Sequence, residues 1–400
     1  MFDHLQITNA RERHVVGFGD TLLRGLAPLL NRPPVRKDGP AERILLLRLE
    51  RIGDLLMALG AITEVRRFAP GAQIDLVVGS WNADLAHTIR ELDHVEILDV
   101  PWLARENGGA SWSTLLRTAS EWRRRQYDLG INFEGDIRSN LLLGVAGATR
   151  RIGFAMRGGG PVLTDPVEFS ETAHSATNSC QLVRQAFGSE EAPLDDEPGR
   201  RDAGKLQIPE DARARAAALL EQAGATEMLI GIQASAGREI KQWNPERFAE
   251  VGSVLAREYG ATLVMTGTTS ERHVTERVKQ SVDQSVRTID MTGDLDLLTM
   301  AGIIERMALF VSCDTGPMHL ASAVGTPTVA IFGPSLPSRY APLLDRSRVV
   351  RVDLPCSPCN QLRRPPARCV GHIPDCLTGI EVGPVLAAAR ELLRTVPGQD

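Results

Sequence analysis

Three short segments place polar or charged residues directly after an apolar run, where a strand would end and a helix begin. The first is Arg51-Ile52-Gly53-Asp54. A carboxylate at the carboxyl edge of a parallel sheet is well placed to act as a general base. An acid in the first helical turn also stabilises the helix dipole by about 0.3–1 kcal/mol. Spacing alone leaves both roles of Asp54 open.

The second segment is a loop of small residues around Ser235, which would let a ligand approach the backbone. Arg238 and Lys241 would supply the positive charge that a phosphate group needs. Asn244 is the predicted N-cap of the next helix, with Pro245 at its first position. The alternative is a solvated loop that carries two ordinary surface bases.

The third segment opens another helix after a strand, with Thr315 and Gly316 at its start. Free amide groups at a helix start form an anion site. Asp314 as N-cap and Pro317 in the first turn would also be favoured for folding alone. Folding does not explain His319 one turn later, which could hold a diphosphate or orient Asp314, unless it is simply a packed or surface histidine.

Two further acidic positions invite a ligand-binding interpretation. Glu271 follows a predicted strand, and its carboxylate is suited to accept hydrogen bonds from sugar or ribose hydroxyls; the alternative is a capped helix start. Asp294 and Asp296 superficially match a metal-binding acid pair. They open a predicted helix, so we interpret them as capping residues and expect no divalent metal there.

Four of the six cysteines lie in one short, proline-rich segment: Cys356, Cys359, Cys369 and Cys376. Six cysteines in 400 residues are too few for a disulfide scaffold. Four clustered thiolates match the ligand count of a tetrahedral structural site for zinc or iron, which would order a segment that has little regular structure. The alternatives are reduced surface thiols or adventitious disulfides.

The pattern of apolar runs predicts the elements that would position these residues. Short strands and longer helices alternate, which is typical of parallel sheets with helices on both faces. We expect an extension over 1–40 with an amphipathic stretch at 15–30, one Rossmann-like domain over 41–200, a polar linker within 189–205, and a second Rossmann-like domain over 205–400 that includes the four-cysteine segment 356–376. A site in a cleft between two such domains is the simplest arrangement.

Several classes of protein are disfavoured by the same sequence. The first strand is followed by a single glycine, whereas the dinucleotide fingerprint needs three, and no Gly-Lys-Ser/Thr phosphate loop is present. The net charge of −5 argues against a protein whose whole surface is shaped for nucleic acid and leaves a local basic patch open. The apolar run from Leu55 to Ile62 is too short to span a bilayer, and the N-terminus lacks a secretory signal pattern, so we expect a cytoplasmic protein.

Taken in order, these motifs resemble those of glycosyltransferase family nine, the ADP-heptose heptosyltransferases that build the lipopolysaccharide inner core. The resemblance is spread over most of residues 43–395. It is carried by residues 44–49 with Ile52-Gly53-Asp54, by 135–139 and 151–154, and most specifically by 314–319, 325–327 and 332–334.

The resemblance implies a GT-B fold of two Rossmann-like domains, the first for the acceptor and the second for a nucleotide sugar, and inverting transfer without a catalytic metal. Asp54 matches the base. Lys241, Ser235, Thr315 and Gly316 match groups around the leaving diphosphate. Glu271 matches the donor-domain acid, and Asp314 and His319 match residues lining the donor site.

Four functions remain open. The first is transfer of heptose from ADP-heptose to a lipopolysaccharide core or related glycan, with the amphipathic stretch 15–30 docking the enzyme at the inner face of the membrane. The second is transfer to protein hydroxyls, since some protein-modifying members of the family resemble this chain in having a four-cysteine iron finger. The third is a non-catalytic nucleotide-sugar-binding or scaffold protein. A nucleotide-sugar epimerase fits the motifs less well.

Overall fold

The computed structural model divides the chain into two compact units, Met1–Gly204 and Lys205–Asp400, here called unit 1 and unit 2. It describes residues 2, 5–7, 9–30, 40–104, 108–189, 205–293, 295–362 and 365–394, with the side chains of 26–30 left out. The predicted linker therefore lies outside the described residues except at its two ends, Ser189 and Lys205.

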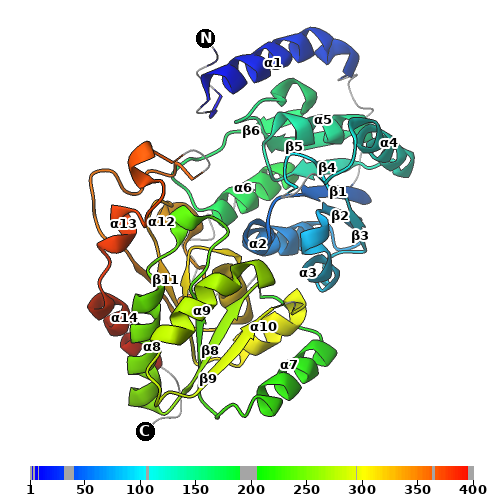
Figure 1. Ribbon diagram of the computed structural model, residues 1–400. Helices are drawn as coiled ribbons and strands as arrows, with labels where there is room; N and C mark the ends of the chain where they lie inside the picture. The colour runs from blue at the N-terminus through cyan, green and yellow to red at the C-terminus, as the bar shows by residue number, and fades with distance from the viewer. Residues whose placement is uncertain are drawn as a thin grey trace. The chain divides into compact units, whose positions relative to one another are not determined.

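Unit 1 is a six-stranded sheet in which all neighbouring strands run parallel, with the order β3-β2-β1-β4-β5-β6 (Figure 1). Its strands are β1 (Arg43–Arg48), β2 (Gln73–Val78), β3 (His94–Ile97), β4 (Leu129–Asn132), β5 (Arg150–Phe154) and β6 (Asp165–Val167). Its helices are α1 (Ala10–Leu30), α2 (Ile52–Phe68), α3 (Ala83–His87), α4 (Trp112–Trp122), α5 (Ile137–Ala146) and α6 (Ser175–Phe187), with the short 3-10 helices η1 (Ser80–Asn82), η2 (Arg123–Arg125) and η3 (Gly160–Val162).

The central strand of unit 1 is apolar along its whole length because helices cover both faces of the sheet. Residues 44–47 of β1 are fully buried. Leu45 and Leu47 pack in one core with Trp122 and Leu142, from α4 and α5. On the other side of the sheet, α2 packs against α6. A strand buried on both faces shows no alternation of polar and apolar residues, which is the pattern expected in a parallel sheet.

Unit 2 repeats this architecture, with the parallel order β12-β11-β10-β7-β8-β9. Its strands are β7 (Leu229–Gln233), β8 (Thr262–Gly267), β9 (Thr288–Thr292), β10 (Leu309–Cys313), β11 (Thr328–Ile331) and β12 (Ser347–Val350). Its helices are α7 (Glu210–Gln222), α8 (Pro245–Tyr259), α9 (Arg272–Ser281), α10 (Leu297–Glu305), α11 (Gly316–Val324), α12 (Pro337–Tyr340), α13 (Asp375–Thr378) and α14 (Val382–Arg394), with η6 (Glu239–Lys241), η7 (Thr269–Glu271) and η8 (Ala367–Cys369).

Each sheet has one point at which the strand order reverses. In unit 1 the chain builds outward from β1 to β3, and then returns to place β4 on the other side of β1. In unit 2 the same step separates β7 from β10. The helices that follow the two central strands therefore diverge, and ligands of such sheets bind at this switch point, outside the carboxyl ends of the strands.

The predicted α/β architecture, in which short strands alternate with longer helices and form parallel sheets, is confirmed in both halves. The amphipathic stretch predicted at 15–30 lies within α1. Asn244 caps α8 as predicted, since its side chain accepts from the amides of Glu246 and Arg247. No helix in the described part of the chain is both long and apolar enough to cross a membrane.

Candidate functional site

Asp54 lies in the first turn of α2, directly after β1 and beside the switch point of unit 1. Its Oδ2 accepts the backbone N–H of Arg51 at 3.1 Å, so it closes the start of the helix. Its side chain is nevertheless 30% exposed, and the guanidinium of Arg48 lies 3.9 Å from its Oδ1. Asp54 therefore stabilises the helix and also presents a carboxylate to solvent, where it can accept a proton.

The sequence analysis did not single out the charged groups behind Asp54. Arg48 donates from Nε to the carbonyl of Asp54 and from Nη1 to the carboxylate of Glu50, each at 3.0 Å. The side chain of Glu134, which follows β4 and is 3% exposed, accepts the N–H of Leu49 at 2.5 Å. Two strands on opposite sides of the switch point thus supply one charged cluster, a placement that only the strand order reveals.

The acidic members of this cluster have perturbed titration behaviour. Burial, followed by the charge of Asp54, raises the pKa of Glu50 to about 7. Burial, followed by the charge of Glu50, raises the pKa of Glu134 to about 8. Asp136 differs: burial opposes its ionisation, but hydrogen bonds and charge from Arg138 outweigh burial and lower its pKa. Acids with such pKa values are typical of functional sites.

Aromatic rings and arginines also gather after the strands of unit 1. The guanidinium of Arg51 lies 4.6 Å from the ring centroid of Trp81, and that of Arg138 lies 4.8 Å from the centroid of Trp102. Trp102 stacks on Trp112, a residue that is 48% exposed. Flat aromatic faces and guanidinium groups suit a ligand that combines apolar sugar faces with anionic groups.

In unit 2 the structure brings together two of the predicted residues. Lys241, at the end of η6, places its Nζ 2.7 Å from Oδ2 of Asp314, and both side chains are largely buried. Asp314 does not cap α11, because Thr315 is the N-cap residue. The predicted N-cap role of Asp314 is therefore wrong, although Pro317 does lie in the first turn, and the observed partner of Asp314 is Lys241. An ammonium group has three protons, so Lys241 can hold Asp314 and a phosphate together.

Buried polar contacts hold the loop that carries Lys241 against the sheet of unit 2. Ser235 is 1% exposed, and its Oγ accepts from Nε2 of Gln233 at 2.5 Å, while Oε1 of Gln233 accepts from Thr266. The backbone N–H of Trp243 donates to Sγ of Cys313. These contacts tie the loop after β7 to β8 and β10, so Lys241 is held on a rigid support.

The other predicted donor-side residues fall into two groups. Thr315 and Gly316 open α11 beside Asp314, with no side-chain capping bond from Thr315, and His319 lies one turn further along the helix, 7% exposed. Glu271 closes a capping box, since its Oε2 accepts from both the N–H and the hydroxyl of Thr268. Glu271 thus makes the capping contact that the sequence offered as its alternative role.

The acid pair predicted to cap a helix is described only in part. Asp296 is the N-cap of α10 and accepts from the N–H of Thr299, which confirms its predicted capping role. Asp294 lies outside the described residues.

The cysteine segment is the part of unit 2 that lies between β12 and α14. Burial raises the pKa of Cys376 to about 11, and the nearby Cys359 and Cys369 also act to raise it. Throughout the described residues, no three His, Cys, Asp or Glu side chains are grouped closely enough to hold a metal ion. The four-cysteine metal site therefore stays a prediction, and a metal would have to draw these side chains together.

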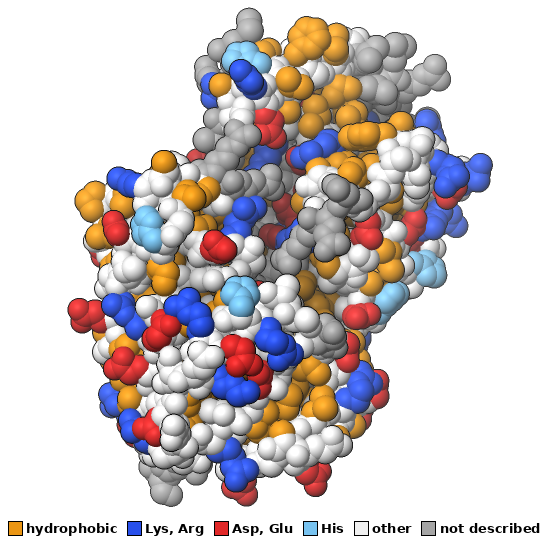
Figure 2. Space-filling view, viewed as in Figure 1, with side chains coloured by type: hydrophobic (Ala, Val, Ile, Leu, Met, Phe, Trp, Pro, Cys, Tyr) orange, Lys and Arg blue, Asp and Glu red, His pale blue; other side chains and the backbone are white. Residues whose placement is uncertain are grey.

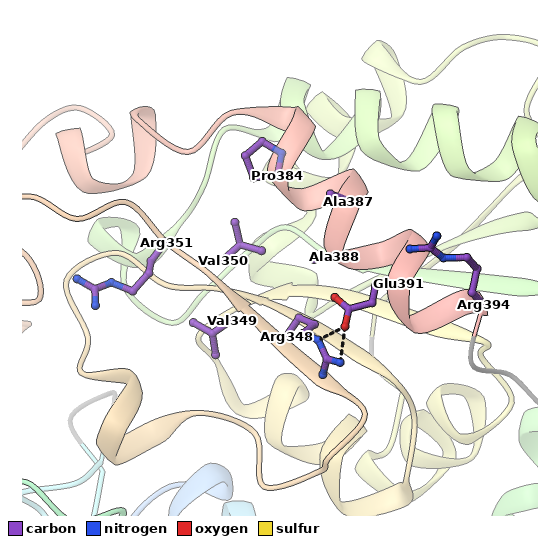
Figure 3. Close-up of a pocket in the computed structure, with 9 residues that line it drawn as sticks. All are labelled: Arg348, Val349, Val350, Arg351, Pro384, Ala387, Ala388, Glu391 and Arg394. Carbon is purple, nitrogen blue, oxygen red and sulfur yellow. Dashed lines mark hydrogen bonds and ion pairs between the residues drawn. The ribbon is translucent and has the colours of Figure 1, made fainter.

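A shallow hollow lies between β12 and α14 and is lined by Arg348, Glu391 and seven neighbours (Figure 3). Figure 3 shows Arg348 and Glu391 joined across it, with a shortest distance of 2.6 Å. None of the predicted site residues lines this hollow.

Two parallel sheets of Rossmann type match the architecture of the GT-B glycosyltransferases. Comparisons with known proteins agree. The model of "Glycosyltransferase family 9 (heptosyltransferase)" matches residues 115–366. This match spans more than half of the chain, which therefore belongs to glycosyltransferase family 9 and is a glycosyltransferase.

Individual relatives support the assignment. The chain is 26% identical to lipopolysaccharide heptosyltransferase 1 of Pseudomonas aeruginosa, over 79% of this chain and 86% of the relative. Among solved structures, a family 9 glycosyl transferase from Veillonella parvula has a TM-score of 0.75 at 23% identity and covers 89% of this chain and 98% of its own. The E. coli ADP-heptose lps heptosyltransferase II has a TM-score of 0.70 at 20% identity, covering 88% and 98%. These structures share the fold.

Proposed function

We propose that this glycosyltransferase moves a heptose from ADP-heptose to a lipopolysaccharide core or related glycan, with inversion at the anomeric carbon. The observation that carries the proposal is the buried Lys241–Asp314 pair at the switch point of unit 2, where a phosphate-bearing donor is expected to bind. The names of the relatives support the sugar and the acceptor, since they are lipopolysaccharide or lipooligosaccharide heptosyltransferases.

On the acceptor side, Asp54 removes the proton from the attacking hydroxyl group. The hydroxyl oxygen forms a bond to the anomeric carbon while the bond from that carbon to the diphosphate oxygen breaks on the opposite face. A single displacement of this kind inverts the configuration. A positioned general base contributes about 10²–10⁴-fold to the rate. The arginines and tryptophans around Trp81 and Trp102 support an acceptor that is a sugar with anionic substituents.

On the donor side, negative charge grows on the departing diphosphate, which must be met by groups already in place. Lys241 supplies a full positive charge, and the first amides of α11 around Thr315 and Gly316 supply partial ones. Asp314 holds the ammonium in position through the 2.7 Å contact. We further propose that Ser235, Glu271 and His319 contact the donor. No catalytic metal is needed in this scheme.

Calorimetric titration with ADP-heptose, ADP and UDP-sugars tests the donor. We expect ADP-heptose to bind preferentially, and to bind Lys241→Ala more weakly because the diphosphate loses its cation. We also expect the rate of heptose transfer by Lys241→Ala to fall by about 10²–10³-fold. Arg287→Ala is the control: it removes a cation of the same unit, but Arg287 lies just before β9, at the amino end of the strands, and donates to the carbonyl of Gly224. A folded protein that binds no nucleotide sugar would refute the proposal.

Transfer assays with Asp54→Asn test the chemistry and the acceptor together. We expect donor binding to persist while transfer to a lipopolysaccharide-core acceptor falls by about 10²–10⁴-fold, because only the base is lost. Efficient modification of a glycan-free protein with no transfer to core sugars would replace the proposed acceptor by protein hydroxyl groups. The four-cysteine segment is the feature that keeps this second acceptor under consideration.

A further inference from the structure

Several carboxyl groups near Asp54 share one arginine, Arg48. Arg48 is shared by Glu50, at 3.0 Å, and by Asp54, at 3.9 Å, and its charge also acts on Glu134. Arg157 acts on Glu50 from beyond β5, whereas Asp136 is neutralised by its own partner, Arg138, at 2.7 Å. Arg48 thus acts on three carboxyl groups, those of Glu50, Asp54 and Glu134. Carboxyl groups that interact closely do not all ionise together.

The same contacts connect Glu134 mechanically to the turn that carries Asp54. Glu134 accepts the N–H of Leu49, and Arg48 donates to the carbonyls of Phe133 and Asp54. The end of β4, the end of β1 and the first turn of α2 are therefore joined by one set of hydrogen bonds. A change in the charge of Glu134 therefore alters its electrostatic interaction with Arg48, which in turn interacts with Asp54.

We propose that Glu134 is a positioning residue for Asp54: through the N–H of Leu49 and through Arg48 it sets the place and the electrostatic surroundings of the Asp54 carboxylate. The proposal rests on the proposed function for its catalytic consequence only. It extends the site from one acid to a unit of four residues at the ends of β1 and β4 and the start of α2.

The proposal has a pH signature, because the pKa of Glu50 is raised to about 7 and that of Glu134 to about 8, so both carboxyl groups lose their protons in this range. The groups that face the pair are Arg48, Asp54, Asp136, Arg138 and Arg157. Guanidinium groups stay charged in proteins, and Arg138 lowers the pKa of Asp136. Loss of the two protons therefore adds negative charge beside Asp54, which favours transfer of the acceptor's proton to it.

The first experiment is the pH profile of kcat for the wild type, Glu134→Gln and Glu50→Gln. We expect kcat of the wild type to rise over the pH range between about 7 and about 8, and each variant to lose the part of the rise that belongs to the carboxyl group it removes. The side-chain carbonyl in Glu134→Gln can still accept the N–H of Leu49, yet kcat should fall by up to about 10²-fold with the KM for the donor unchanged, because the base is less well placed. A variant that retains the full wild-type rise would overturn the proposal.

The second experiment needs neither donor nor acceptor. Infrared difference spectra taken below and above this pH range should show loss of protonated-carboxyl C=O bands in the wild type and a smaller loss in Glu134→Gln, in which only Glu50 remains to titrate. Asp75→Asn is the matched control, since Asp75 is a buried acid of the same sheet that pairs with Tyr127 and Arg125 instead. If Glu134→Gln lost as much of the band as the wild type, the protonation of Glu134 would be refuted, whereas absence of transferase activity alone would refute only the proposed function.

Discussion

At the scale of single residues, the raised pKa of Glu134 should affect stability as well as catalysis. The pKa of Glu134 is raised from 4.5, the value expected in an unfolded chain, to about 8 in the folded chain, first by burial and then by Glu50. Between these values the folded chain binds more protons than the unfolded chain. Its free energy of unfolding therefore falls as the pH rises through this window.

We predict that Glu134→Gln removes this part of the pH dependence, so that stability between pH 4.5 and about 8 becomes flatter than in the wild type. Urea unfolding at a series of pH values checks it. Four of the five tryptophans, Trp81, Trp102, Trp112 and Trp122, belong to unit 1, so tryptophan fluorescence mainly follows the relevant unit. Parallel curves for the two proteins would contradict the prediction.

At the scale of elements, α2 must be held firmly because it carries Asp54. Its Glu64 forms a 2.8 Å ion pair with Arg184 of α6, and both side chains are 7% exposed. We predict that Glu64→Ala costs about 3–5 kcal/mol of unfolding free energy, because it leaves a buried guanidinium without its counter-charge. Glu258→Ala, which breaks the exposed pair with Arg390, is the control and should have a far smaller effect. Equal losses in urea unfolding would show that burial is not the cause.

Elements also show what the sequence could and could not predict. The segments around Asp54, Lys241 and Asp314 were found because a strand end followed by a helix start is visible in one stretch of sequence. Glu134 was missed because its importance depends on β4 lying next to β1, and it bonds a residue 85 positions away. Strands β5, β6 and β12 were not predicted either, since β5 begins with two arginines, β6 has three residues with a proline at its centre, and β12 begins with Ser347-Arg348.

The cysteine segment is an element whose order we expect to depend on metal. It contacts the loop after β11, since Oγ of Ser357 donates to the carbonyl of Gly333 and the N–H of Asn360 donates to that of Pro334. We predict that the purified protein contains about one zinc or iron per chain, and that Cys359→Ser loses it. Elemental analysis checks this, with the buried Cys180→Ser, from α6, as the control. Metal-free wild type that does not take up either ion would contradict the prediction.

At the scale of the whole molecule, α1 is a feature that neither sheet requires. Its inner face is fixed to unit 1, where Asp20 accepts the N–H of Gly159 at 2.6 Å. Its outer face exposes three large apolar side chains at helical spacing, Val15, Phe18 and Leu22, by 57% or more. Figure 2 shows hydrophobic side chains gathered at the top of the view, where α1 runs in Figure 1. An apolar stripe of this kind suits the surface of a bilayer.

We therefore propose that α1 docks the enzyme on the membrane that carries a lipid-linked acceptor. Phe18→Asp should weaken binding to vesicles of phosphatidylethanolamine and phosphatidylglycerol by about tenfold or more, because burying one large apolar side chain contributes about 1.5–3 kcal/mol. It should also slow transfer to an acceptor embedded in vesicles while leaving transfer to a detergent-free, water-soluble core sugar unchanged. Thr21→Asp introduces the same charge on the same helix without removing an apolar side chain, so it controls for charge alone. If both variants bound vesicles as the wild type does, the stripe would have to serve contact with another protein or another copy of the chain.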